Sequence, residues 1–176
     1  MDAAAHYRHL RTLGRDEFLA SAAPAALVRY RAQRWNRSVA GTNTLTFNQD
    51  HGETMDEAPA GGRFSAEPTE MELYPLAKKP GASFPDRITI GRTENNDVVI
   101  ADPSVSRLHA YVRQASDWVI ADAASKNGSW LGLDALEPRR ETALAPGAVI
   151  RLGDVELRFY RSTDLFELLG GDHGRR

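Results

Sequence analysis

Between residues 71 and 161 the chain consists of short apolar runs separated by polar turns, and several runs alternate apolar and polar residues. A period of two is typical of strands with one face in a core, and turns roughly every 8 to 12 residues are typical of a β-sandwich. The sequence therefore predicts an all-β unit over 71–161, in which Pro75 requires an edge strand and Gly153-Asp154 forms a hairpin turn. The expected strands are 71–76, 87–90, 98–100, 110–113, 118–122, 129–131, 148–152 and 155–160.

The first segment, residues 1–40, contains seven Arg, no Lys and three acids. Residues 3–13 predict a helix that ends at Gly14, and Asp16-Glu17 favours the start of another, because carboxylates stabilise a helix N-terminus. Residues 24–31 fit either a helix or a strand. We expect a basic, helical N-terminal extension over 1–40.

Two further segments flank the predicted sandwich. Residues 41–70 hold six acids, one Arg and several Gly and Pro, a composition that favours an acidic, flexible linker. Residues 162–176 predict a short helix over 163–169 and a tail. So short a helix is stable only when docked, and we expect it to lie on the sandwich or on the N-terminal helices.

The arginines between residues 29 and 37 leave an alternative open. With Tyr30 and Trp35 they can contact phosphates and stack on bases, as in single-stranded nucleic-acid binding. A solvated basic face is the favoured interpretation. The net charge of −2 gives no global signal for a polyanion partner, so nucleic acid is not the expected ligand.

Composition excludes several other classes. The 176 residues include no Cys, so disulfides and thiolate metal sites are excluded. No apolar run approaches the roughly 18 residues of a membrane helix, and the first twenty residues are too charged for a secretory signal. We expect a soluble, cytoplasmic protein with no cofactor, metal site or membrane contact.

Chemistry-bearing residues gather where three predicted strands end, at Gly91-Arg92, at 106–109 and at 125–128. These turns supply two Arg, one Lys, hydroxyls and an amide. Cationic and neutral donors together can replace the water around an oxyanion such as phosphate. Residues 71–163 contain twelve Lys and Arg and twelve Asp and Glu, so the cations form a local concentration on a neutral unit.

The order and spacing of these motifs resemble the forkhead-associated (FHA) domain over roughly residues 72–160. The landmarks are Ile90-Gly91-Arg92, 96–100, 102–110, Trp118 with Asp122, and Ser125-Lys126-Asn127-Gly128-Ser129. The resemblance implies a β-sandwich of about eleven short strands that binds phosphothreonine peptides through loops at one end. The N-terminal helices and the C-terminal helix lie outside it.

The resemblance also implies the ligand contacts. Arg92 is expected to anchor the phosphate through its planar guanidinium, Ser106 to donate its hydroxyl, and Arg107 to add a second cation. Asn127 is expected to hold the peptide backbone after the phosphothreonine. Ser125 either joins the phosphate shell or caps its turn.

Three residues are expected to support the site, and one departs from the family pattern. His109 is expected to brace the Ser106 loop through hydrogen bonds, and Gly91 and Gly128 to shape the turns. Lys126 stands where the family often has Thr or an apolar residue. A hydroxyl contact is thereby lost and a mobile charge gained.

These observations lead to a phosphothreonine-reading adaptor in Ser/Thr kinase signalling, whose partner is a phosphorylated protein such as a kinase or its substrate. A second hypothesis is that Thr54, followed by acids, is phosphorylated and occupies the chain's own pocket. The alternative is a phosphate-independent interaction or oligomerisation scaffold on the same sandwich. An enzyme is not expected, because Ser106 and His109 lack an orienting acid and an oxyanion hole in the sequence.

Overall fold

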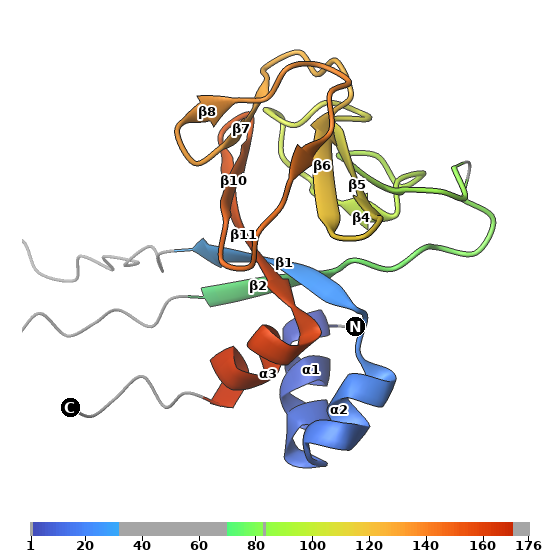
Figure 1. Ribbon diagram of the computed structural model, residues 1–176, viewed down its shortest axis with the longest axis vertical. Helices are drawn as coiled ribbons and strands as arrows, with labels where there is room; N and C mark the ends of the chain where they lie inside the picture. The colour runs from blue at the N-terminus through green and yellow to red at the C-terminus, as the bar shows by residue number, and fades with distance from the viewer. Residues whose placement is uncertain (1, 32–69, 83, 171–176) are drawn as a thin grey trace, which may run out of the picture. The chain divides into compact units, whose positions relative to one another are not determined.

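The computed structural model describes residues 2–31, 70–82 and 84–170. Within these ranges the chain forms eleven strands and three helices (Figure 1). The helices are α1 (Ala3–Thr12), α2 (Arg15–Ser21) and α3 (Ser162–Gly170). The strands are β1 (Ala25–Arg31), β2 (Glu70–Pro75), β3 (Ile88–Gly91), β4 (Val98–Val99), β5 (Ala110–Gln114), β6 (Trp118–Asp122), β7 (Ser129–Leu131), β8 (Asp134–Ala135), β9 (Thr142–Ala143), β10 (Val149–Leu152) and β11 (Val155–Arg161).

The strands form two sheets that face each other, as the sequence predicts. One sheet has the order β2-β1-β11-β10-β7-β8 and the other β4-β3-β5-β6-β9. The core between them consists of alternate residues from both sheets, including Ile90, Ile120 and Phe159, each fully buried. Trp118 packs on Phe159 with 5.7 Å between ring centroids. The all-β prediction is confirmed.

Strand β1 decides the ambiguity at residues 24–31 in favour of a strand. It pairs antiparallel with β11, with Ala25 opposite Arg161 and Val28 opposite Arg158. The helical alternative for this stretch is wrong, because its apolar residues are buried on both faces of a sheet. Leu27 packs in the sandwich core, whereas Val28 packs in a second core between the sheet and the helices. The first sheet therefore includes residues from outside the predicted 71–161 unit.

The second core lies between the three helices and the outer face of β1, β2 and β11, at the lower end of the sandwich in Figure 1. Phe18 of α2 and Leu165 of α3 are fully buried in it, and Tyr7 of α1 is 4% exposed. Phe18 contacts Tyr7 and Phe166 edge to face, with centroid separations of 5.8 and 5.4 Å. The two predicted N-terminal helices and the docked C-terminal helix are thus present.

Two strand details agree with the sequence and two strands were not predicted. Strand β2 is an edge strand, which explains why Pro75 is tolerated there. Strands β10 and β11 form the predicted hairpin around Gly153-Asp154. The two-residue strands β8 and β9 are too short to show a period. None of the helices in the described ranges is long and apolar enough to cross a membrane.

Candidate functional site

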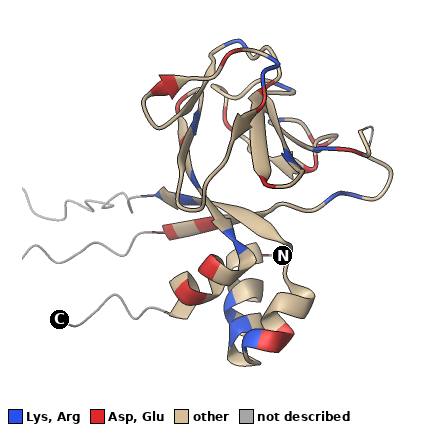
Figure 2. Cartoon of the chain, viewed as in Figure 1, with Lys and Arg blue, Asp and Glu red and all other residues tan. Residues whose placement is uncertain are grey.

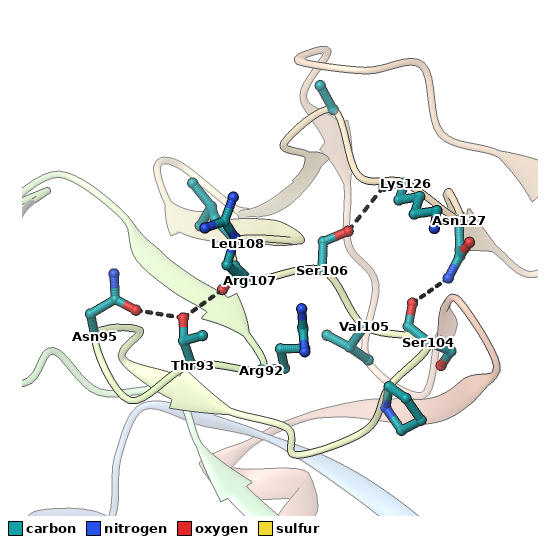
Figure 3. A pocket seen from close by; sticks show the side chains of 12 residues that line it. Arg92, Thr93, Asn95, Ser104, Val105, Ser106, Arg107, Leu108, Lys126 and Asn127 are labelled. Atoms are coloured by element: carbon teal, nitrogen blue, oxygen red, sulfur yellow. Dashed lines mark hydrogen bonds between the residues drawn. The ribbon is translucent and has the colours of Figure 1, made fainter.

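Three loops at one end of the sandwich, those following β3, preceding β5 and following β6, enclose a pocket of about 810 Å³ (Figure 3). The loop before β5 lies between the other two. Each loop comes from the end of a strand in the second sheet, so the register of β3, β5 and β6 fixes their separation. The lining residues are Arg92, Thr93, Asn95, Pro103, Ser104, Val105, Ser106, Arg107, Leu108, Ala124, Lys126 and Asn127.

The loop after β3 is fastened to the loop before β5 by close backbone contacts. The Arg92 N–H donates to the Ser106 carbonyl at 3.0 Å, and Asn96 Nδ2 donates to the Arg107 carbonyl at 2.6 Å. A Cβ at Gly91 would overlap the Arg107 carbonyl oxygen and lie 2.7 Å from Asn96 Nδ2. Glycine at position 91 is therefore required by the close approach of the two loops.

The loop before β5 is fastened to the loop after β6 through Ser104 and Ser106. Asn127 Nδ2 donates to the Ser104 carbonyl at 2.7 Å, and the Lys126 N–H donates to Ser106 Oγ at 2.9 Å. Asp102 Oδ1 accepts from the Ser104 N–H at 3.0 Å and from its hydroxyl at 2.7 Å. The Ser106 hydroxyl accepts from Lys126, so its own proton is available to a ligand.

His109 is fully buried behind the pocket and joins two of the loops. Its Nδ1 accepts from the Ser106 N–H at 2.9 Å, and this contact places the proton on Nε2, which donates to the Gly128 carbonyl at 3.0 Å. Burial lowers the pKa of His109, although the Gly128 carbonyl and the Asp122 carboxylate act in the opposite direction. The neutral imidazole thus connects the loop that carries Ser106 to the turn that carries Gly128.

Asp122, at the end of β6, organises the turn that carries Lys126 and Asn127. Its carboxylate accepts from the Ser125 N–H at 2.9 Å, the Ser125 hydroxyl at 2.6 Å and the Ser129 hydroxyl at 2.5 Å. Burial alone would raise the pKa of Asp122, but these hydrogen bonds outweigh it and the pKa is lowered. Ser125 Oγ also accepts from the Gly128 N–H at 3.0 Å. The Ser125 hydroxyl is therefore engaged in capping this turn, and Ser125 does not line the pocket.

The cations of the pocket are Arg92, Arg107 and Lys126, all exposed at the surface. None of their charged groups makes a hydrogen bond or ion pair with a residue in the described ranges. Asp97, five positions after Arg92, is engaged elsewhere: its Oδ2 accepts from Lys78 Nζ at 2.8 Å and from the N–H and hydroxyl of Thr89. No Asp or Glu is among the described residues that line the pocket.

The structure brings together most of the predicted site residues and adds others. Arg92, Ser106, Arg107, Lys126 and Asn127 all line one pocket. Thr93, Asn95 and Ser104 also line it and were not singled out. The signal that could have found them is their position beside the predicted residues in the same polar turns.

The basic stretch considered for nucleic acid is only partly described. Arg29 lies 3.4 Å from Asp102 and 3.8 Å from Glu72, and Arg31 lies 3.0 Å from Glu72. Figure 2 shows this basic end of β1 beside the acidic start of β2. These two arginines are thus neutralised by acids. Arg34, Trp35 and Arg37 of the same stretch, and Thr54, lie outside the described residues.

The fold and the pocket together define a β-sandwich module with a cationic pocket on the loops at one end. Residues 88–153 match the family model of the FHA domain, a range that includes all three pocket loops. This match to the FHA domain agrees with the resemblance read from the motifs of the sequence.

Several known proteins are similar to this chain. An FHA domain-containing protein of Arabidopsis thaliana is 37% identical over 81 residues, which are 45% of this chain and 20% of that protein. The oxoglutarate dehydrogenase inhibitor of Corynebacterium jeikeium is 27% identical over 119 residues, 65% of this chain and 81% of that protein. The structure of Mycobacterium tuberculosis EmbR in complex with a low-affinity phosphopeptide has 30% identity and a TM-score of 0.44, covering 58% of this chain and 23% of EmbR. The chain thus spans less than a quarter of the plant protein and of EmbR.

Proposed function

We propose that the protein is an adaptor that binds phosphothreonine peptides in the pocket formed by Arg92, Ser106, Arg107 and Lys126. The observation that carries the proposal is that three cations and a hydroxyl with an available proton line one pocket. No acid is among its described lining residues, and the charged groups of the cations have no ion pair within the described part of the chain. A phosphate group carries about −1.5 to −2 charges at pH 7 and three acceptor oxygens, which this set of donors complements.

Four of the pocket residues have separate tasks in the proposed complex. Arg92 donates two parallel hydrogen bonds to the phosphate, and Ser106 donates its hydroxyl to a third oxygen. Arg107 adds charge from the same loop. Asn127 keeps the Ser104 carbonyl in place with its amide nitrogen and has its carbonyl oxygen for the peptide backbone.

The binding test is a titration of the purified chain against one peptide in phosphothreonine, phosphoserine and unphosphorylated forms. We expect binding of the phosphothreonine form and a loss of at least about tenfold in Arg92→Ala, since a charge-assisted hydrogen bond contributes roughly 1.5–3 kcal/mol. Arg8→Ala, which removes an exposed arginine of α1, is the charge-matched control and should bind as the parent does. Equal binding of all three peptide forms by a folded protein would favour the phosphate-independent scaffold.

The proposal extends to the partner of the protein, its cellular compartment and its mode of action. The partner is a substrate of a Ser/Thr kinase or the kinase itself, the setting is the cytoplasm, and the protein acts as a binding module. The chain's own Thr54, once phosphorylated, is a candidate ligand of the same pocket. If a chain phosphorylated at Thr54 captures external phosphopeptide as well as the unphosphorylated chain, this last part is incorrect.

A further inference from the structure

We propose that the pocket selects phosphothreonine peptides with an acidic side chain close to the phosphate, and that Lys126 recognises that acid. This inference rests on the proposed function and specifies the class of peptide that the site takes. It assigns a selective role to the residue at which the chain departs from the family pattern.

The charge balance of the pocket favours a ligand with an acid beside the phosphate. Three cations line it, and no acid is among the described lining residues. A phosphate of about −1.5 to −2 charges neutralises two cations and leaves one without a counter-charge. A carboxylate on the same peptide supplies that charge, whereas a lysine or arginine at this position would be repelled.

The arrangement of the cations leaves Lys126 beside the phosphate position. Figure 3 shows Arg107 and Lys126 on opposite sides of Ser106, with Arg92 below it. A phosphate held by Arg92 and Ser106 therefore lies between the other two cations. In an extended peptide that continues past Asn127, the residues that flank the phosphothreonine lie close to Lys126.

Lys126 combines a fixed backbone with a side chain whose charged group has no partner in the described ranges. Its N–H donates to Ser106 Oγ at 2.9 Å, so the residue is anchored at the pocket wall. Its ammonium makes no hydrogen bond or ion pair with a described residue and lies on a flexible stem. A compact ammonium with three donors suits a carboxylate that can come from more than one peptide position.

The experiment compares phosphothreonine peptides that differ only in the flanks. One has neutral flanks, a series carries a single Asp at each of the three positions on either side, and a matched series carries Lys instead. We expect the best acidic peptide to bind about three- to tenfold more tightly than the neutral one, with an advantage that shrinks as salt is raised. The readout is the dissociation constant of the neutral peptide divided by that of the best acidic peptide.

Variants at position 126 test the assignment. Lys126→Ala should bring the ratio close to one, Lys126→Arg should keep it, and Lys126→Glu should reverse it in favour of the Lys-flanked peptides. Arg8→Ala removes one positive charge outside the pocket and should keep the parent ratio. Thermal unfolding of each variant verifies that it is folded.

The possible failures are distinguishable. If the parent binds neutral and acidic peptides equally, or if Lys126→Ala keeps the preference, the inference is overturned while the proposed function stands. If no phosphothreonine peptide binds a folded parent protein, the proposed function is overturned and the inference with it.

Discussion

Arg29 of β1 forms an ion pair with Asp102 of the pocket loop, with 3.4 Å between Nη2 and Oδ2. The other carboxylate oxygen, Oδ1, holds the Ser104 N–H and hydroxyl, and the Ser104 carbonyl accepts from Asn127. Strand β1, which lies outside the matched range of residues 88–153, is thereby connected through Asp102 and Ser104 to Asn127, which lines the pocket. The side chains of Arg29 and Asp102 are only 17% and 22% exposed, which reduces screening by solvent.

This connection predicts that Arg29 positions the pocket without touching the ligand. Arg29→Ala should weaken phosphothreonine-peptide binding by about two- to tenfold, because Asp102 loses its partner and Ser104 its fixed position. Arg31→Ala is the matched control, since Arg31 pairs with Glu72 on the same strand pair and does not reach Asp102. In a double mutant with Asn127→Ala the two losses should be less than additive. Full additivity, or equal loss in the two arginine variants, would argue against a positioning role.

Gly91→Ala should destabilise the domain by about 1–3 kcal/mol and abolish ligand binding, because the new methyl group overlaps the Arg107 carbonyl and forces the two loops apart. The comparison is Gly132→Ala, where a Cβ meets nothing within 4 Å and only the positive φ of 61° opposes it. That substitution should cost about 1 kcal/mol and leave binding intact. Denaturant unfolding and peptide titration of both variants measure the difference.

The two serines proposed from the sequence should behave differently. Ser106→Ala should reduce phosphopeptide affinity by roughly tenfold with little loss of stability, since its hydroxyl faces the pocket and its loss removes a bond to a charged group. Ser125→Ala should lower the free energy of unfolding by about 1–3 kcal/mol, since buried Asp122 and the Gly128 N–H lose a partner. The ratio of affinity loss to stability loss separates the two roles. A larger affinity loss in a fully stable Ser125→Ala protein would assign Ser125 to the phosphate.

Stability should decrease as the pH falls below about 6.5, the usual pKa of histidine. Burial lowers the pKa of His109 in the folded state, so at such pH the unfolded chain binds a proton that the folded chain does not. The stabilising contribution is complete above about 6.5 and is lost toward the lowered folded pKa. Asp122, the carboxylate facing the ring, opposes this shift without reversing it.

The measurement is the free energy of unfolding of the parent and of His109→Asn at pH values between about 7.5 and 5. The variant replaces Nδ1 with an acceptor that does not titrate, so its stability should be lower but should depend less on pH. The carboxylates Asp97 and Asp122, whose pKa values are lowered, lose their contributions only in more acidic solution. Parallel pH profiles for the two proteins would show that His109 is not the responsible group.

The sequence by itself determined the type of fold and most of the pocket. Strands such as β5 and β11 alternate clearly because one face meets the core and the other faces outward. Polar residues in the loops at the ends of β3, β5 and β6 identified Arg92, Ser106 and Asn127, since loops at strand ends are where a sandwich presents ligand-binding side chains. Local pattern and turn chemistry identified the three loops, and the resemblance to the FHA domain supplied the role expected of each residue in them.

Only the tertiary structure decided the place of β1 and the connections between the loops. Residues 25–28 are apolar without a period because both of their faces are covered, one by the opposite sheet and one by the helices, so their pattern fits two secondary structures equally. Arg29 and Asp102 are 73 positions apart, and His109 meets Gly128 across 19. Such contacts depend on strand order and register, which are set by the packing of the whole core. No regular spacing in the sequence indicates them.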